Sequence, residues 1–341
     1  MKLRHKLAGT VALPLALAVA ASTATAATIF ENDQHRVNFG GFVAAQANWT
    51  IFDDAVGQDS DIDYGMSLGT SRMNLSYTRQ TDAGPITILF ENDFNGPSGS
   101  NYRLRHAAIM WDGWVAGFSW SGAANLTGLG ETIDAGGTAN TSAMAQRTMV
   151  LGRNIPVAEG MTVGVFLEDR TNSFSTGVGQ TDRDANTALP DAVVNFRANL
   201  GATQLFGAAT LLQFDDAEAT GDAKTESQVE LTFGARSQIT DELRVHLALT
   251  NTNDNDDTYV SVGAQYRINQ QLRTNLLVEQ ALRDADDSDY TALWANAFYT
   301  MPSGWEWGGE LRYMTADDNA GKLNGLGDSD MRISLQAKYA F

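Results

Sequence analysis

The sequence predicts an all-β fold, a 16-stranded antiparallel transmembrane β-barrel. Three observations support this prediction. Apolar and polar residues alternate in one segment after another, the connections between segments are short and long by turns, and the last segment ends in an aromatic residue at the carboxyl terminus. Lipid offers no hydrogen-bond partner to an open sheet edge, so a sheet that crosses a membrane must close into a cylinder.

The carboxyl-terminal segment shows the alternation most clearly. From Met331 to Phe341 every odd position is apolar or aromatic, and the residues between are polar or small. Such a strand has one face for lipid and one for water. Tyr339 and Phe341 form an aromatic end typical of the closing strand of bacterial outer-membrane barrels. We therefore expect this strand to carry the signal read by the barrel-assembly machinery.

Fifteen further segments precede the closing strand. In the segment at 102–110, alternation predicts Arg103 and Arg105 inward and Ala108 and Met110 outward. Residues 148–155 alternate poorly, and their position along the chain assigns them as a strand. Residues 204–214 are apolar on both faces, which leaves the direction of their side chains open, and residues 290–301 are ambiguous. The predicted strands are residues 37–49, 72–77, 86–93, 102–110, 114–121, 148–155, 161–168, 192–199, 204–214, 228–236, 242–250, 259–267, 272–279, 290–301, 305–313 and 331–341.

The connections sort strictly into two kinds. Barrels of the outer membrane have short periplasmic turns, longer extracellular loops and an even number of strands. A soluble β-sandwich is the alternative, but it has no reason to sort its loops in this way. The short connections lie near residues 80–84, 113, 156–160, 200–203, 237–241, 268–271 and 302–304, and the long ones near 50–66, 95–101, 122–147, 169–190, 215–226, 252–257, 283–288 and 316–328.

The amino terminus predicts export. Three basic residues in the first six precede an apolar run over residues 7–21, and small residues before Ala27 fit a signal-peptidase site. The run is short and is broken by Pro14, which argues against a membrane anchor. We therefore expect a secretory signal peptide at 1–26, a short periplasmic segment at 27–35 and the barrel at 36–341. The chain has no cysteine, so disulfides cannot stabilise it.

Tryptophan and tyrosine fall near the ends of the predicted strands. Aromatic rings with a polar tip prefer the two membrane interfaces, although ordinary core packing is the alternative. The residues expected in these interface belts are Trp49, Tyr77, Trp111, Trp114, Trp120, Trp305, Trp307 and Tyr339.

The chain is acidic, with 41 Asp and Glu against 23 Lys and Arg and a net charge of −18. This charge argues against binding of nucleic acid, which requires a basic surface. Much of the acid falls in the long loops, where it forms either a solvated surface or a cation bridge to lipopolysaccharide. The run from Asp254 to Asp257 lacks the glycine and the distal glutamate of an EF-hand. No metal-ligand, nucleophile or phosphate-loop pattern is present, so we expect neither an enzyme nor a cofactor.

Basic residues follow a different distribution. Many arginines fall at predicted inward positions, and we expect Arg72, Arg103, Arg105 and Arg332 to form a basic ladder along the pore. A guanidinium group is always charged and can hold a carboxylate through two parallel hydrogen bonds. The alternative is that these arginines pair with inward acids as part of the wall.

The third long loop, residues 122–147, is glycine-rich and contains Glu131 and Asp134. Its length and position predict that it folds inward as a constriction loop, with both acids facing the arginine ladder. The alternative is an exposed outer loop.

Residues 36–121 carry a resemblance to a known family. Phe90-Glu91-Asn92-Asp93-Phe94, the run Arg103-Leu104-Arg105-His106-Ala107 and the strand end Gly117-Phe118-Ser119-Trp120-Ser121 resemble the DcaP-like family of trimeric outer-membrane porins. The resemblance implies a homotrimer that passes small organic anions such as dicarboxylates, with Arg103 and Arg105 lining the pore. The founding member's coiled-coil segment before the barrel is not matched in residues 27–35.

The sequence thus predicts a water-filled channel in the outer membrane of a Gram-negative bacterium, through which small hydrophilic solutes diffuse passively with a preference for anions. Its expected partners are outer-membrane lipid and lipopolysaccharide, further copies of itself, the barrel-assembly machinery and the solutes. One alternative is a general porin without selectivity or with cation preference. Another is a structural or adhesive barrel with a plugged lumen.

Overall fold

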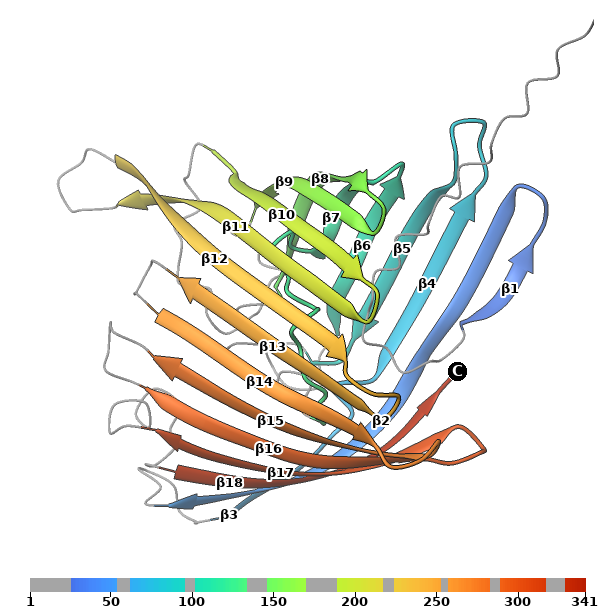
Figure 1. Cartoon of the computed structure of the whole chain (residues 1–341). Helices are drawn as coiled ribbons and strands as arrows, with labels where there is room; N and C mark the ends of the chain where they lie inside the picture. The colour runs from blue at the N-terminus through green and yellow to red at the C-terminus, as the bar shows by residue number, and fades with distance from the viewer. Residues whose placement is uncertain are drawn as a thin grey trace, which may run out of the picture.

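The computed structural model is an all-β, closed barrel of sixteen antiparallel strands, as the sequence predicts (Figure 1). It describes residues 26–53, 62–95, 102–133, 146–169, 189–216, 224–252, 257–282, 289–316 and 329–341. Within these ranges no helix is long and apolar enough to cross a membrane. The same ranges hold no group of three His, Cys, Asp or Glu side chains arranged to bind a metal ion.

Eighteen labelled strands build this barrel. The strands are β1 (Ala27–Glu31), β2 (His35–Asp53), β3 (Ile62–Ser67), β4 (Arg72–Arg79), β5 (Ile86–Asp93), β6 (Arg103–Trp111), β7 (Trp114–Trp120), β8 (Arg147–Ala158), β9 (Met161–Asp169), β10 (Asp191–Leu200), β11 (Thr203–Asp216), β12 (Lys224–Gln238), β13 (Leu243–Thr252), β14 (Asp257–Arg267), β15 (Leu272–Leu282), β16 (Tyr290–Thr300), β17 (Trp305–Ala316) and β18 (Ser329–Ala340).

Two features explain why eighteen strands form a barrel of sixteen. Strands β3 and β4 both pair with β2 and form one interrupted strand. Strand β1 pairs with the first residues of β2, next to the place where β18 ends. The barrel closes between β18 and β2, and the backbone groups of Phe341 and Gly41 exchange two hydrogen bonds of 3.0 and 3.1 Å. The segment expected as a short extension at 27–35 therefore contains a strand of its own.

Several of the short turns contain a residue with a left-handed backbone. The turn between β6 and β7 consists of Asp112 and Gly113, with φ angles of 47° and 80°. This Asp-Gly pair is typical of the two-residue turn that matches the twist of a hairpin. A Cβ atom at Gly113 would lie 2.3 Å from the carbonyl oxygen of Asn154, so a side chain there would displace the β8 backbone.

The two faces of the sheet differ as the alternation predicts. On β15, Leu276 and Val278 are 51% and 42% exposed, whereas Asn275 and Glu279 are buried on the opposite face. The same contrast holds around the wall, where the outer face exposes leucine, valine, isoleucine and aromatic side chains and the buried polar residues lie on the inner face. An apolar outer surface of this extent fits lipid rather than water.

Strand β6 departs from simple alternation. Its register with β5 shifts at Glu91, and Arg105 is the extra residue that forms a β-bulge. Beyond the bulge, Ala108 is only 2% exposed and Ile109 is 51% exposed. The predicted outward direction of Ala108 and Met110 is therefore wrong, because one extra residue reverses every side chain that follows it.

Apolar side chains also cover two parts of the inner wall. The first cluster lies on β7 to β11, with Ala123 added from the segment after β7, and the second lies on β15 and β16. These patches explain why residues 148–155, 204–214 and 290–301 do not alternate, because the inward face is apolar there as well. The clusters are Val115, Ala123, Val150, Phe166, Val193, Phe206 and Ala208, and Leu277, Ala292 and Trp294.

Candidate solute pathway through the barrel

The segment after β7 runs along the inner wall rather than away from the barrel. At its start, the Gly122 amide donates to Oε1 of Glu168 on β9 at 2.6 Å, and Asn195 on β10 donates to the Gly122 carbonyl oxygen at 2.6 Å. A Cβ atom at Gly122 would lie 2.5 Å from the Phe166 ring. Glycine at this position therefore allows the segment to lie flat on the apolar inner cluster.

The middle of the segment crosses β12 and β13. Asn125 donates to the Phe233 carbonyl oxygen at 2.7 Å, and Nη2 of Arg236 donates to the carbonyl oxygens of Leu126 and Leu129 at 3.1 and 3.0 Å. A Cβ atom at Gly128 would lie 2.6 Å from the Cβ atom of Ala248, so the backbones approach closely. Arg236 thus holds the segment by its carbonyl groups.

The far end is fixed by Glu131. Nη2 and Nε of Arg273 on β15 donate to the two carboxylate oxygens of Glu131 at 2.6 and 2.9 Å. Gln265 on β14 donates to the same carboxylate at 2.8 Å, and Asn296 on β16 donates to the Glu131 carbonyl oxygen at 2.8 Å. The carboxylate faces these strands, and none of its hydrogen bonds goes to the predicted ladder of Arg72, Arg103 and Arg105.

The last described residue of the segment reaches the seam of the barrel. The Ile133 amide donates to Glu310 on β17 at 2.8 Å, and Gln46 on β2 donates to the Ile133 carbonyl oxygen at 2.8 Å. Residues 122–133 therefore contact strands from β9 through β17 to β2. Asp134, the second acid expected in the constriction, lies outside the described residues.

A basic cluster occupies a different part of the wall, on β4, β6 and β8. Two of its members share two buried carboxylates. Nε and Nη2 of Arg103 donate to Asp93 at 2.9 and 2.6 Å, while Arg105 donates to Glu91 at 2.7 Å and to Asp93 at 2.8 Å. The Arg103 side chain stays 21% exposed and that of Arg105 only 4%. Both arginines form the wall, and Arg103 also presents a surface to the lumen.

The other two members have no acidic partner. Arg72 lies over the Phe42 ring, 5.4 Å from Cζ to the centroid, and Arg147 lies over the Trp120 ring at 3.6 Å. Neither guanidinium group forms a hydrogen bond or an ion pair with any residue in the described ranges. The interaction with each aromatic ring holds the cation in place without neutralising its charge.

Arg332, the fourth residue of the predicted ladder, lies apart from this cluster. It pairs in register with Arg312 across β17 and β18, and Arg312 donates to Asp330 at 2.6 Å. The ladder predicted from the sequence is therefore divided between two places on the wall.

A second group of arginines lies toward the short-turn end of β12 to β15. Arg244 donates to Gln265 at 2.6 Å, and Arg267 is exposed and pairs in register with Arg273. Arg273 also donates to Glu306 at 2.9 Å, and this acid accepts from Lys338 at 3.0 Å. The carboxylates of this side are thus concentrated around Arg273.

Most of the predicted interface aromatics lie on the outer face. Trp111, Trp114, Trp305, Trp307 and Tyr339 are 39–53% exposed. Trp305 contacts both Trp307 and Tyr339 in an aromatic cluster. Three further residues are partly buried, and among them Trp49 packs on Tyr64 and Tyr77 on His35.

Trp120 is different from the other predicted belt residues. It contacts His106 with a centroid separation of 5.5 Å and lies beneath Arg147 in the basic cluster. The sequence reasoning missed Arg147 and His106 as members of this cluster. Arg147 was assigned to the end of the long loop at 122–147, because the poor alternation of residues 148–155 concealed the start of β8. His106 could have been found as the neighbour of Arg105 in the Arg-Leu-Arg-His run.

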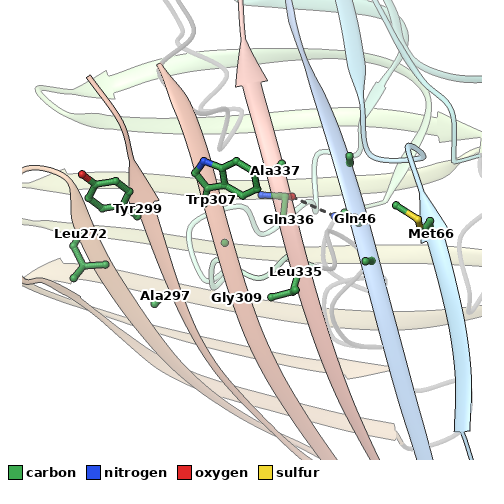
Figure 2. Close-up of a pocket in the computed structure, with 13 residues that line it drawn as sticks. Gln46, Met66, Leu272, Ala297, Tyr299, Trp307, Gly309, Leu335, Gln336 and Ala337 are labelled. Carbon is green, nitrogen blue, oxygen red and sulfur yellow. Dashed lines mark hydrogen bonds between the residues drawn. The ribbon is translucent and has the colours of Figure 1, made fainter. Parts of the chain in front are cut away.

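The outer wall also carries a shallow apolar groove of about 450 Å³ across β2, β3 and β15 to β18. Figure 2 shows Trp307 and Tyr299 on one side of it and Met66 on the other, with Leu335 and Gly309 between them. Small residues make the floor, so the wall is locally thin on its lipid side.

Comparisons with known proteins agree with this architecture. The solved outer-membrane channel DcaP of Acinetobacter baumannii superposes with a TM-score of 0.74 at 19% identity, over 92% of this chain and 99% of that one. An anion-selective porin from Comamonas acidovorans gives 0.65 at 15% identity, over 90% and 100%. Salmonella typhi OmpF, solved with daunomycin, gives 0.63 at 14% identity, over 92% and 99%.

No family model and no curated protein sequence matches the chain. At these identities the structural matches show the fold, which is that of outer-membrane porins. They do not assign the chain to the DcaP-like family.

Proposed function

We propose that this chain is an outer-membrane porin that lets small hydrophilic solutes diffuse through a water-filled lumen, with a preference for small organic anions such as dicarboxylates. The fold supports the general channel, because barrels of 16 to 18 strands are wide enough to hold an aqueous path. The anion preference rests on the wall chemistry of this chain.

One observation carries the preference. In the cluster on β4, β6 and β8, four guanidinium groups lie near two carboxylates of the described residues, Glu91 and Asp93, and these two are bound by Arg103 and Arg105. An excess of fixed positive charge beside a narrow, low-dielectric passage concentrates anions and repels cations. The preference follows although the chain as a whole is acidic, because the cluster lies on the wall of the barrel.

The described part of the third long loop supports the same preference for anions. Residues 122–130 contain no charged side chain, and Glu131 is neutralised by Arg273. The described part of the segment therefore narrows the lumen without adding free negative charge. We propose that the whole loop at 122–147 forms the constriction, with Asp134 as its remaining acid.

The proposed partners follow from the outer surface. The exposed apolar belt would contact outer-membrane lipid and lipopolysaccharide, and the strand ending at Tyr339 and Phe341 would be read by the barrel-assembly machinery. We propose a homotrimer in the manner of the DcaP-like porins, and one structural neighbour, the outer membrane protein OmpT of Vibrio cholerae, was solved in a trimer form. Mass spectrometry of the protein released from detergent would give the number of copies.

Planar bilayers with a salt gradient test the selectivity. The reversal potential of the wild-type channel should indicate anion preference, and Arg72→Gln and Arg103→Gln should each reduce the anion-to-cation permeability ratio by roughly twofold or more. Arg36→Gln is the control, because Arg36 pairs with Glu31 and is exposed. Cation-side reversal in the wild type would instead establish a cation-preferring or general porin, and the absence of any conductance would establish a structural barrel.

A further inference from the structure

The basic cluster contains a group of buried donors that nothing in the described residues satisfies. Four nitrogen atoms on adjoining parts of the wall are buried without a hydrogen-bond partner: Nε of Arg72, Nε2 of His106, Nε1 of Trp120 and Nε of Arg147. The two Arg nitrogens and the Trp nitrogen are obligate donors. A buried polar group without a partner is costly, so several in one place require an explanation.

His106 fits the same pattern. It is completely buried, and its Nδ1 atom lies 3.2 Å from Oγ of Ser119. When the Ser119 hydroxyl donates to Nδ1, the neutral ring carries its proton on Nε2. His106 then becomes a further donor in the group.

The charges also lack balance at this place. Arg147 is repelled by Arg105, Arg72 and Arg103, and Glu91 acts in the opposite direction without forming an ion pair with it. The two nearby carboxylates, Glu91 and Asp93, are already bound by Arg103 and Arg105. A buried charge without a counter-ion is unfavourable, and a small anion would supply both the missing charge and the missing acceptors.

The other end of the same strand pair provides a comparison within the chain. Trp114 and Arg153 face each other across β7 and β8, as Trp120 and Arg147 do. The Arg153 side chain is 42% exposed, lies 5.6 Å from the Trp114 ring and forms an ion pair with Asp112 at 2.6 Å. At one end of this hairpin the arginine that lies over a tryptophan, Arg153, is paired with an acid. At the other end the buried arginine, Arg147, has no such acid among the described residues.

We propose that the donors of Arg72, His106, Trp120 and Arg147 form a binding site for one small monovalent anion, either a halide or a carboxylate as small as acetate. The site is built into the wall beside the proposed pathway. With the anion bound, both guanidinium groups without acidic partners acquire a counter-ion. Occupancy is a property of the cluster and does not depend on whether the channel conducts anions.

The test uses the purified full-length protein in detergent. Thermal unfolding is followed in chloride, bromide, acetate and gluconate at equal ionic strength, because gluconate is too large for a buried site. A saturable rise in the unfolding temperature of about 2–4 °C in the smaller anions over gluconate is expected. A rise in the unfolding temperature with halides alone identifies a halide site, and an equal or larger rise with acetate identifies a carboxylate site. Crystals grown in bromide should show anomalous density beside Arg147.

Two variants separate the site from a general salt effect. Trp120→Phe removes one donor and keeps the ring, so it should weaken the response, whereas the matched control Arg153→Gln should keep it. Among residues 134–145, which precede Arg147 in the sequence, the acid is Asp134, so Asp134→Asn tests whether its carboxylate takes the place of the anion. A wild-type protein with no anion response that gains one in Asp134→Asn would overturn the proposal, as would an equal response in all four salts. Because these experiments measure thermal unfolding and not conductance, they test the anion site separately from the proposed anion preference of the channel.

Discussion

The two sides of the barrel interior use arginine differently. On β4, β6 and β8, Arg103 and Arg105 share two carboxylates, while Arg72 and Arg147 form no ion pair within the described ranges. Around Arg273, two cations share the carboxylates of Glu131 and Glu306. The first side keeps an excess of positive charge. On the second side, the ion pair between Arg273 and Glu131 attaches residues 122–133 to the wall.

The difference shows that the number of acids within reach, rather than the number of arginines, determines what an inward arginine does. An arginine paired with a carboxylate has a defined geometry and holds the segment that carries the carboxylate in place. An arginine held against an aromatic ring keeps its positive charge, which can act on ions in the lumen. Substitutions on the first side should therefore change selectivity, and those on the second should change the position of the loop.

Asp93→Asn should have the largest effect. Its carboxylate accepts from both Arg103 and Arg105 and is 1% exposed. Removing the charge leaves buried cations with one acid, Glu91, and should destabilise the barrel by about 3–5 kcal/mol. Urea unfolding in detergent would measure the loss, and the channel that still folds should show a higher anion preference in bilayers.

The control for this variant is Asp112→Asn at the exposed ion pair with Arg153. An exposed pair contributes about 0–1 kcal/mol, so stability and selectivity should both stay close to the wild type. Equal losses in the two variants would contradict the distinction between the buried cluster and the surface.

Much of the barrel could be predicted from the sequence because lipid imposes period 2 on one face of every strand. The prediction fails where a local event interrupts that period. The bulge at Arg105 reversed the direction of Ala108, and no signal in the sequence marks an extra residue. Where Phe206 and Trp294 make the inner wall apolar, alternation disappears although the strand is present.

The candidate site was less predictable than the fold. Arg72, Arg103 and Arg105 could be nominated because inward arginines stand out in an alternating strand. The contact between Glu131 and Arg273 joins residues 142 positions apart, and nothing local specifies such a pair. Arg147 was missed because Thr148 and the residues after it alternate poorly, which hid the start of β8.

Glu131→Gln should have an intermediate effect, concentrated on the loop. The ion pair with Arg273 is partly exposed, so its loss should cost about 1–3 kcal/mol. Residues near Glu131 should then detach from β14 and β15 because the amide cannot accept from Arg273 as a carboxylate does. Single-channel recordings should show larger or noisier open currents than the wild type.

Glu242→Gln is the matched control, because Glu242 lies in an exposed turn and its carboxylate accepts only from the Thr240 hydroxyl among the described residues. Its currents should equal those of the wild type. If Glu131→Gln also gives wild-type currents, the carboxylate is not what positions the segment in the lumen.

Arg267→Gln should have the smallest effect and gives the sharpest contrast with Arg273. Both arginines lie opposite each other on β14 and β15, but Arg267 is exposed and forms no ion pair within the described ranges, whereas Arg273 holds Glu131. Stability should stay within about 0.5 kcal/mol of the wild type, as is usual for an exposed substitution. The loss of an unneutralised charge should still lower anion permeability slightly, and more at low salt, because screening weakens such fields. An unchanged reversal potential at low salt would show that charge at this end of β14 does not act on passing ions.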